Sequence, residues 1–348
     1  MAERIENPAG LDGFEFVMFA AEDPAPLHAL FRNMGLAAVG RHKRAPVTLF
    51  QAGDVRFLVA KAEEGFTGDF ARAHGASACA MGFHVKDSSA ARATALDRGA
   101  TKIADADDPI GAPAIEGIGG ARVYLVDEAI GREIYANDFE PITDDAPIPD
   151  TGLIEIDHLT HNVHRGQMDK WAKYYEDIFN FVQIRFFDIE GKKTGLFSKA
   201  MTSPCGKIRI PLNESQDDKS QIAEYLREYN GEGIQHIALS CRNIYDTVPT
   251  MRRLGIDFQD TPETYYELID GRLPGHGENV AALRKERILI DGGEAQGGGF
   301  LLQIFTQNVI GPIFFEIIQR KGNEGFGEGN FQALFESIEL DQERRGVL

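Results

Sequence analysis

The sequence predicts an α+β fold built from four tandem units, each with one strand, one helix and then several further strands. Short strand-like runs alternate with amphipathic helical segments, and the pattern returns at intervals of roughly 70–80 residues. Similar segments, ALDRGA at 95–100 and MRRLGI at 251–256, follow a strand in two of the units. Helices paired with antiparallel strands in this way pack in layers around a shared core. The 348 residues suffice for about two domains.

The first half of the chain contains two of the units. Residues 14–20 (FEFVMFA) have the composition of a buried strand, and Asp23 and Gly35 mark the two ends of the helix that follows. Gly99 ends the helix of the second unit in the same way. We expect helices at 23–35 and 88–98, and strands at 14–20, 46–51, 55–60, 80–86, 122–126 and 132–137.

The second half repeats the plan more clearly. Apolar residues recur at helical spacing through 167–179, and Ser220 is suited to cap the next helix. We expect helices at 167–179, 220–230, 244–254 and 330–344. The expected strands lie at 153–163, 181–189, 194–201, 207–213, 233–241, 287–291, 298–306 and 313–320.

An acidic, proline-containing stretch at 138–151 (NDFEPITDDAPIPD) separates the halves. Its composition is typical of a solvated connection. We therefore expect one domain at 1–140, a linker at 141–152 and a second domain at 153–348.

The charge balance excludes several kinds of partner. The chain has 54 acidic and 36 basic side chains and a formal net charge of −18, which disfavours nucleic acid and anionic membranes because both need basic surfaces. No apolar run approaches the length of about 20 residues that a membrane span requires, and no signal peptide is visible. Three unpatterned cysteines indicate reduced thiols, so we expect a cytoplasmic protein.

Two histidines occupy the first strands of the third and fourth units. They are His158 in EIDHLTH and His236 in GIQHIAL. Equivalent positions in tandem units should face one another across a shared concavity. Glu316, inside the apolar run IFFEIIQR, would be costly to bury without a partner. Two histidines and a carboxylate form the facial triad of non-haem Fe(II) oxygenases.

Two alternatives to this triad stay open on the residues alone. A strand histidine is often a hydrogen-bonded structural residue, and Glu316 could instead pair with an arginine. His161 also rivals His158: residues three apart on a strand point to opposite faces, so only one of the two can face the site. Periodicity does not choose between them.

Other motifs exclude further chemistry. The glycine-rich segment 325–331 (GFGEGNF) lacks the Lys-Ser/Thr of a phosphate-binding loop, and no GxSxG is present. This segment is better suited to a lid or hinge before the last helix, which would carry apolar residues toward a pocket.

The segments DHLTHNV, GLFSKAM, IRIPLNE, GEGIQHIAL, LLQIFT and IFFEIIQRKGNEGFGEGNF strongly resemble the bacterial 4-hydroxyphenylpyruvate dioxygenase family. The resemblance covers nearly all of the second half and is looser in the first. It implies a two-domain vicinal-oxygen-chelate fold, in which four βαβββ modules form two open barrels and a C-terminal helix follows. It also implies that the metal belongs to the second domain and that the first is structural. In agreement, alignment on Gly99 and Gly255 sets Ala80 opposite His236.

The resemblance further implies one Fe(II) per chain, held by His158, His236 and Glu316, with O₂ as co-substrate. It thus favours His158 over His161. Five polar residues are implied in catalysis: Ser198, Asn213, Gln221, Gln235 and Gln303. Seven are implied in substrate binding: Pro211, Phe305, Phe314, Phe326, Asn330, Phe331 and Leu334.

The activity implied is conversion of 4-hydroxyphenylpyruvate and O₂ to homogentisate and CO₂ in tyrosine catabolism, by a dimer or tetramer. The nearest enzyme alternative is 4-hydroxymandelate synthase, which shares the fold, ligands and substrate but oxidises the benzylic carbon. The alternative from another class is a non-catalytic metal-binding protein, such as a pigment- or haemolysis-associated factor. The helix at 330–344 is expected to cover the pocket.

Overall fold

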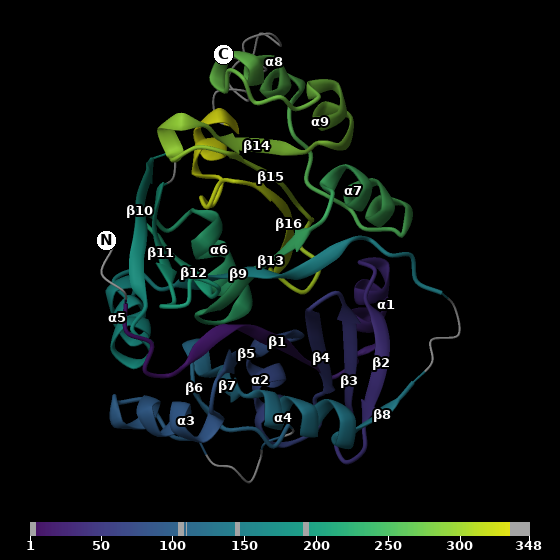
Figure 1. The fold of residues 1–348 in the computed structure, drawn as a ribbon, viewed down its shortest axis with the longest axis vertical. Helices are drawn as coiled ribbons and strands as arrows, with labels where there is room; N and C mark the ends of the chain where they lie inside the picture. The colour runs from purple at the N-terminus through teal and green to yellow at the C-terminus, as the bar shows by residue number, and fades with distance from the viewer. Residues whose placement is uncertain (1–4, 104–107, 109, 143–146, 191–194, 335–348) are drawn as a thin grey trace.

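The computed structural model describes residues 5–103, 108, 110–142, 147–190 and 195–334. It contains two curled sheets, each with helices packed beside it (Figure 1). In the view of Figure 1 the sheet of the N-terminal half lies below that of the C-terminal half.

The N-terminal sheet has the strand order β6-β7-β5-β1-β4-β3-β2-β8. At its centre β1 and β5 run antiparallel, and each has a parallel outer neighbour, β4 beside β1 and β7 beside β5. Its strands are β1 (Leu11–Ala21), β2 (Ala37–His42), β3 (Val47–Ala52), β4 (Val55–Lys61), β5 (Ser77–Val85), β6 (Ala114–Glu116), β7 (Arg122–Val126) and β8 (Phe139–Pro141).

The C-terminal sheet has the order β10-β11-β12-β9-β13-β16-β15-β14. Its central pair, β9 and β13, is again antiparallel and again flanked by parallel neighbours, β12 and β16. Its strands are β9 (Leu153–Val163), β10 (Val182–Glu190), β11 (Gly195–Thr202), β12 (Arg209–Ser215), β13 (Gly233–Cys241), β14 (Leu289–Gly292), β15 (Phe300–Phe305) and β16 (Phe314–Lys321).

The two sheets therefore repeat one plan, as the recurring sequence units predict. The first, third and fourth units each supply one strand, one helix and three further strands to their sheet. In the described part of the second unit, the helix is followed by β6 and β7, and Lys102 makes a single bridge to Ile115. The short strand β8 comes after these and pairs with β2 at the other edge of the sheet.

Most helices follow the sequence pattern. In α5, one face is apolar and buried, and the helix ends at Asn180, whose φ of 57° stops it with a left-handed residue. Ser220 caps α6 by accepting a hydrogen bond from the Ala223 amide. The helices are α1 (Ala25–Asn33), α2 (Gly65–His74), α3 (Ser88–Asp97), α4 (Glu128–Arg132), α5 (Met168–Phe179), α6 (Gln221–Tyr229), α7 (Ile244–Arg253), α8 (Glu263–Arg272) and α9 (Val280–Glu286).

One expected strand is wrong. Residues 132–137 are helical: α4 continues into a π-helical turn, Glu133–Asp138, before β8 begins. The cause is local, because the Asp127 side chain accepts a hydrogen bond from the Ile130 amide and starts a helix directly after β7. The sequence patterns also did not predict α2, α8, α9 or β2. Of the helix expected at 330–344, residues 328–334 are helical and the remainder lies outside the described residues.

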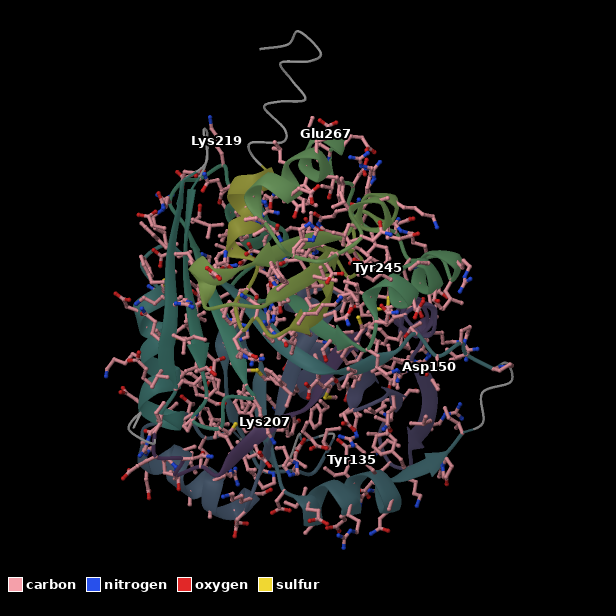
Figure 2. All side chains as sticks on the ribbon, turned by 45° about the horizontal axis from the view of Figure 1, so that its top comes forward. Tyr135, Asp150, Lys207, Lys219, Tyr245 and Glu267 are labelled. Atoms are coloured by element: carbon pink, nitrogen blue, oxygen red, sulfur yellow. The ribbon has the colours of Figure 1, made fainter. Side chains whose placement is uncertain are left out.

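The two halves share an apolar contact. The ring of Phe315, on β16, lies 6.2 Å from that of Phe31 and 5.8 Å from that of Phe57, both in the N-terminal half. At the surface Lys207, labelled in Figure 2, forms a 2.7 Å ion pair with Asp12 of β1. Among the residues that the structure describes, no helix is both long and apolar enough to cross a membrane.

Candidate metal centre

Three neighbouring strands bring the candidate ligands together. Ala238 on β13 pairs with His158 on one side and with Glu316 on the other. His236 lies two residues from Ala238 on the same strand face. The ligand atoms of the three side chains all lie within 4.8 Å of one another. The sequence prediction of a shared concavity is therefore supported by the register of the sheet.

The carboxylate of Glu316 is held between the two imidazoles. Its Oε2 lies 3.1 Å from Nε2 of His158 and 3.5 Å from Nε2 of His236. Burial, the largest effect, opposes ionisation, but hydrogen bonds from the two histidines outweigh it and lower the pKa of Glu316 to about 2. Burial lowers the pKa of His236, which favours the neutral form that binds metals.

The donor set fits a divalent transition metal. Oε1 of Glu316 is buried and has no hydrogen-bond partner among the described residues, although a bare carboxylate oxygen is costly to leave unsatisfied. Two imidazole nitrogens and one carboxylate, converging from one side, leave positions open for other ligands, as in the sites of non-haem Fe(II) oxygenases.

His161 is excluded from this centre by the direction of its side chain. Its Nε2 lies 2.8 Å from the Tyr175 hydroxyl on α5, so the ring points to the other face of β9. Burial lowers the pKa of His161 to about 3. Of the two histidines that periodicity left open, the structure brings His158, and not His161, together with His236 and Glu316.

Each histidine has a partner on its second ring nitrogen. Nδ1 of His158 lies 2.8 Å from Oδ1 of Asp157, and Nδ1 of His236 lies 3.0 Å from Oε1 of Gln235. Both partners offer an acceptor oxygen, so each ring can carry a proton on Nδ1 and use Nε2, on the side of Glu316, as the ligand nitrogen when a metal binds. The ring of Phe314 stacks on that of His236 at 4.9 Å.

A cavity opens beside the centre and contains about 560 Å³ of space, part of it continuous with solvent. Besides the three candidate ligands, seven of the predicted residues line it: Ser198, Pro211, Asn213, Gln303, Phe305, Phe326 and Phe331. Five further lining residues were not predicted: Thr160, Phe187, Leu196, Ala200 and Glu328. Strand alternation could have indicated Thr160 and Ala200, since each lies two residues from a predicted site residue.

The remaining predicted residues lie elsewhere. Gln221 is exposed at the start of α6. Gln235 and Phe314 contact His236, as described above. Leu334 packs against the apolar core at the end of the described chain. None of these four lines the cavity formed by the described residues.

Asn330 is the last of the twelve residues predicted for catalysis or substrate binding. It is buried and forms a hydrogen bond with Gln303. The Tyr265 hydroxyl accepts hydrogen bonds from Nη2 of Arg272 and the Ile290 amide, both at 2.9 Å. Its own proton can go to Oδ1 of Asn330 at 2.6 Å or to the Ile290 carbonyl oxygen at 3.0 Å, of which the first is the shorter contact. Nδ2 of Asn330 donates to Oε1 of Gln303 at 3.3 Å. Gln303 therefore has its Nε2 group left to donate to a ligand.

The fold and the centre together define a class: a metal-dependent oxygenase of the vicinal-oxygen-chelate type, with a two-histidine, one-carboxylate site in the C-terminal sheet. The chain matches two family models. Residues 5–140 match the model described as hydroxyphenylpyruvate dioxygenase, N-terminal, and residues 155–268 match that of the glyoxalase/bleomycin resistance protein/dioxygenase superfamily.

Individual relatives give the narrower assignment. The chain is 55% identical to a 4-hydroxyphenylpyruvate dioxygenase of Legionella pneumophila (strain Corby), over 98% of each chain. It is 56% identical to a protein named Hemolysin VllY of Vibrio vulnificus (strain CMCP6), again over 98% of each. The chain belongs to the 4-hydroxyphenylpyruvate dioxygenase family.

A solved structure matches the fold. A triple mutant of 4-hydroxymandelate synthase from Streptomyces coelicolor superimposes with a TM-score of 0.80, at 24% identity, over 95% of this chain and 99% of the other. At this identity the match supports the fold alone. It agrees with the two curled sheets and with the vicinal-oxygen-chelate fold that the sequence resemblance implied.

Proposed function

We propose that this protein converts 4-hydroxyphenylpyruvate and O₂ to homogentisate and CO₂, using one Fe(II) per chain. The observation that carries the proposal is the convergence of His158, His236 and Glu316 at one wall of a cavity lined by aromatic rings and amides. The full-length similarity to a dioxygenase of that name supports the choice of substrate.

The three ligands would hold the iron, which, when bound, activates O₂ and accepts the 2-oxo acid as a chelating ligand. His158 and His236 supply neutral Nε2 donors because their Nδ1 protons are held by Asp157 and Gln235. Glu316 supplies one negative charge. The metal ion carries two positive charges, and Glu316 would balance one of them. The anionic substrate would balance the other.

The cavity wall would hold the aromatic ring of the substrate. Phe305 and Phe326 are apolar surfaces near the centre, the first 6.4 Å from the His236 ring and the second 5.4 Å from that of His158. Such rings pack against a phenyl group and exclude water from the reacting atoms. Gln303 would donate a hydrogen bond from Nε2 to a substrate oxygen, and Ser198 and Asn213 offer further polar groups on adjacent strands.

The test is product analysis. Purified protein is supplied with Fe(II), ascorbate and 4-hydroxyphenylpyruvate in air, and the products are separated by chromatography. Homogentisate, formed with one CO₂ for each O₂ consumed, is the expected result. Hydroxymandelate would overturn the proposed regiochemistry and favour the synthase reaction. No oxygen uptake by iron-loaded protein would overturn the enzymatic proposal and favour a non-catalytic metal-binding role.

We further propose the wider organisation implied by the resemblance. The division into domains at 1–140 and 153–348, joined by 141–152, is supported by the end of one sheet at β8 and the start of the next at β9. A homodimer or homotetramer in the cytoplasm is proposed from the resemblance and the reduced cysteines. Light scattering after size-exclusion chromatography tests the oligomeric state.

A further inference from the structure

A buried ion cluster lies behind the first candidate ligand. Asp157, next to His158 on β9, is 5% exposed. Arg320 of β16 binds its carboxylate at both oxygens, Nε to Oδ2 and Nη2 to Oδ1, each at 2.7 Å. Arg209 of β12 lies 3.4 Å from Oδ2. Burial, the largest effect, opposes ionisation, but hydrogen bonds from Arg320 and His158 hold the pKa of Asp157 well below its usual range.

Arg320 also binds the segment that follows β16. Nη1 of Arg320 donates to the carbonyl oxygen of Asn323 at 3.0 Å and to that of Gly325 at 2.7 Å. Arg209 pairs in addition with the Glu324 carboxylate. Two backbone carbonyls and one side chain of the segment 323–325 therefore bind the two arginines that contact Asp157.

This segment places part of the cavity wall. Phe326 follows it directly, and its ring lies edge-on to that of His158 with the centroids 5.4 Å apart. Arg320 also lies 6.0 Å from the Phe326 ring. The helical residues 328–334 come next, with Phe331 and Glu328 at the cavity.

We propose that Asp157 and Arg320 are positioning residues that couple the first metal ligand to the cavity wall. Asp157 holds the proton of His158 on Nδ1 and fixes the ring with Nε2 toward the metal. Arg320 holds Asp157 in place and, with the opposite side of its guanidinium, holds the segment that carries Phe326. One side chain, Arg320, therefore contacts both the partner of the ligand and the segment that carries the wall. The inference deepens the proposed function, since it rests on the same metal site.

The geometry separates this role from that of an ordinary ion pair. Arg320 uses four N–H···O contacts, two to the carboxylate and two to backbone carbonyls. A pair that served only to neutralise a buried charge would need no contact with the segment. Lysine carries the same charge but has no planar fork, so it cannot reproduce both sets of contacts. Arg320→Lys therefore removes the coupling while keeping the charge.

The experiment uses Co(II) as the probe for the ligand geometry and 4-hydroxyphenylpyruvate for the wall. Asp157→Asn, Arg320→Lys and a matched control, Asp150→Asn, are compared with the parent protein. Asp150 is an exposed aspartate that pairs with Arg242, so its variant controls for loss of an Asp–Arg pair away from the site. Co(II) affinity is measured from the visible absorption of the bound ion in the absence of substrate.

Asp157→Asn is expected to weaken Co(II) binding about 10–100-fold and to alter the absorption spectrum. Arg320→Lys keeps a cation that can still pair with Asp157, so its Co(II) affinity should change much less than that of Asp157→Asn. Arg320→Lys should instead raise KM for 4-hydroxyphenylpyruvate and speed hydrogen exchange of the amides at 323–328. The control should match the parent in every readout. Co(II) affinity of Asp157→Asn within threefold of the parent would overturn the ligand role, and unchanged KM and exchange in Arg320→Lys would overturn the coupling.

Asp157→Asn leaves two arginines facing a neutral amide, so its folding is checked by circular dichroism. If this variant does not fold, the double variant Asp157→Asn with Arg320→Gln removes both charges, and the same Co(II) criterion applies to it. The Co(II) result is independent of turnover. If Asp157→Asn weakens Co(II) binding but the iron-loaded parent protein makes no homogentisate, the positioning role is supported and the proposed function is overturned. If the parent protein makes homogentisate but Asp157→Asn binds Co(II) as tightly as the parent, the proposed function is supported and the positioning role is overturned.

Discussion

Replacing His161 by glutamine tests which histidine of the DHLTH segment is structural. His161 is fully buried, and its pKa is lowered by burial to about 3 from an ordinary value of 6.5. The folded protein therefore keeps this imidazole neutral across most of the acid range, while the unfolded chain binds a proton below about pH 6.5. Stability attributable to this group is present at neutral pH and is lost as the pH falls from about 6.5 toward 3.

The size of the effect follows from the two pKa values. One histidine that titrates only in the unfolded chain lowers the free energy of unfolding by about 1.4 kcal/mol per pH unit well below its unfolded pKa, and by about 2 kcal/mol between pH 7 and pH 5. Glutamine has no proton to bind in this range. His161→Gln should therefore lower stability at pH 7, where it disturbs the contact with Tyr175, but should show a shallower loss on acidification.

The assay is urea unfolding of both proteins at pH 7, 6 and 5, with a chelator present so that metal binding does not contribute. The other titrating groups are common to both proteins, so the difference between them isolates His161. The difference in the free energy of unfolding between the parent protein and His161→Gln should fall by about 2 kcal/mol from pH 7 to pH 5. A constant difference would refute the assignment of a neutral buried imidazole. A large loss of Co(II) affinity in His161→Gln would instead return this residue to the list of candidate ligands.

Three further predictions concern the cavity, the contact between the halves and the thiols. Gly327 has φ +76°, and a Cβ there would lie 1.8 Å from Oε1 of Gln303. Gly327→Ala should therefore displace the Gln303 amide and reduce kcat/KM at least tenfold, as measured by oxygen uptake. Kinetics equal to those of the parent protein would contradict this prediction. Phe315→Ala should cost about 3–5 kcal/mol in urea unfolding because the ring is fully buried between the halves, and a loss below 1 kcal/mol would argue against a tight contact. Burial raises the pKa of the Cys79 thiol to about 12, so at pH 8 a thiol reagent should modify half-buried Cys205 first and Cys79 only after unfolding, as followed by peptide mass spectrometry.

The sequence predicted the candidate ligands because their strands have simple patterns. Strand-like composition identified the runs at 153–163, 233–241 and 313–320, and the equivalent places of two histidines suggested a shared site. Alternation did not choose between His158 and His161, because that choice depends on which face of β9 meets the cavity; only the family resemblance favoured His158. The pairing of β9 with β13 and β12 decides it.

What the sequence missed depends on contacts between distant residues or on local caps. Asp157 and Arg320 are 163 positions apart, and only the register that sets β9 and β16 on either side of β13 brings them together. Residues 132–137 have a strand-like composition, but the Asp127 cap favours helix there. Gln221 was expected in the pocket, but the described structure places it, exposed, at the start of α6, directly after the Ser220 cap.

The register also explains why no matching metal centre is found among the described residues of the N-terminal half. Ala80 pairs with Met18 and Arg122 as His236 pairs with Thr160 and Phe314. Counting two residues along each strand from these pairs then places Phe16 at the position of His158 and Tyr124 at that of Glu316.

Phe16 and Tyr124 pack against each other at 5.5 Å, and the Tyr124 hydroxyl donates to Asp108 at 2.7 Å. Aromatic packing thus fills the space that open coordination positions would need. Because a phenyl ring and a methyl group cannot bind a metal, restoring one ligand alone would not restore a site. The two halves share a fold, and the identity of three side chains at equivalent positions distinguishes the sheet that carries the candidate ligands from the one in which aromatic and methyl groups stand there.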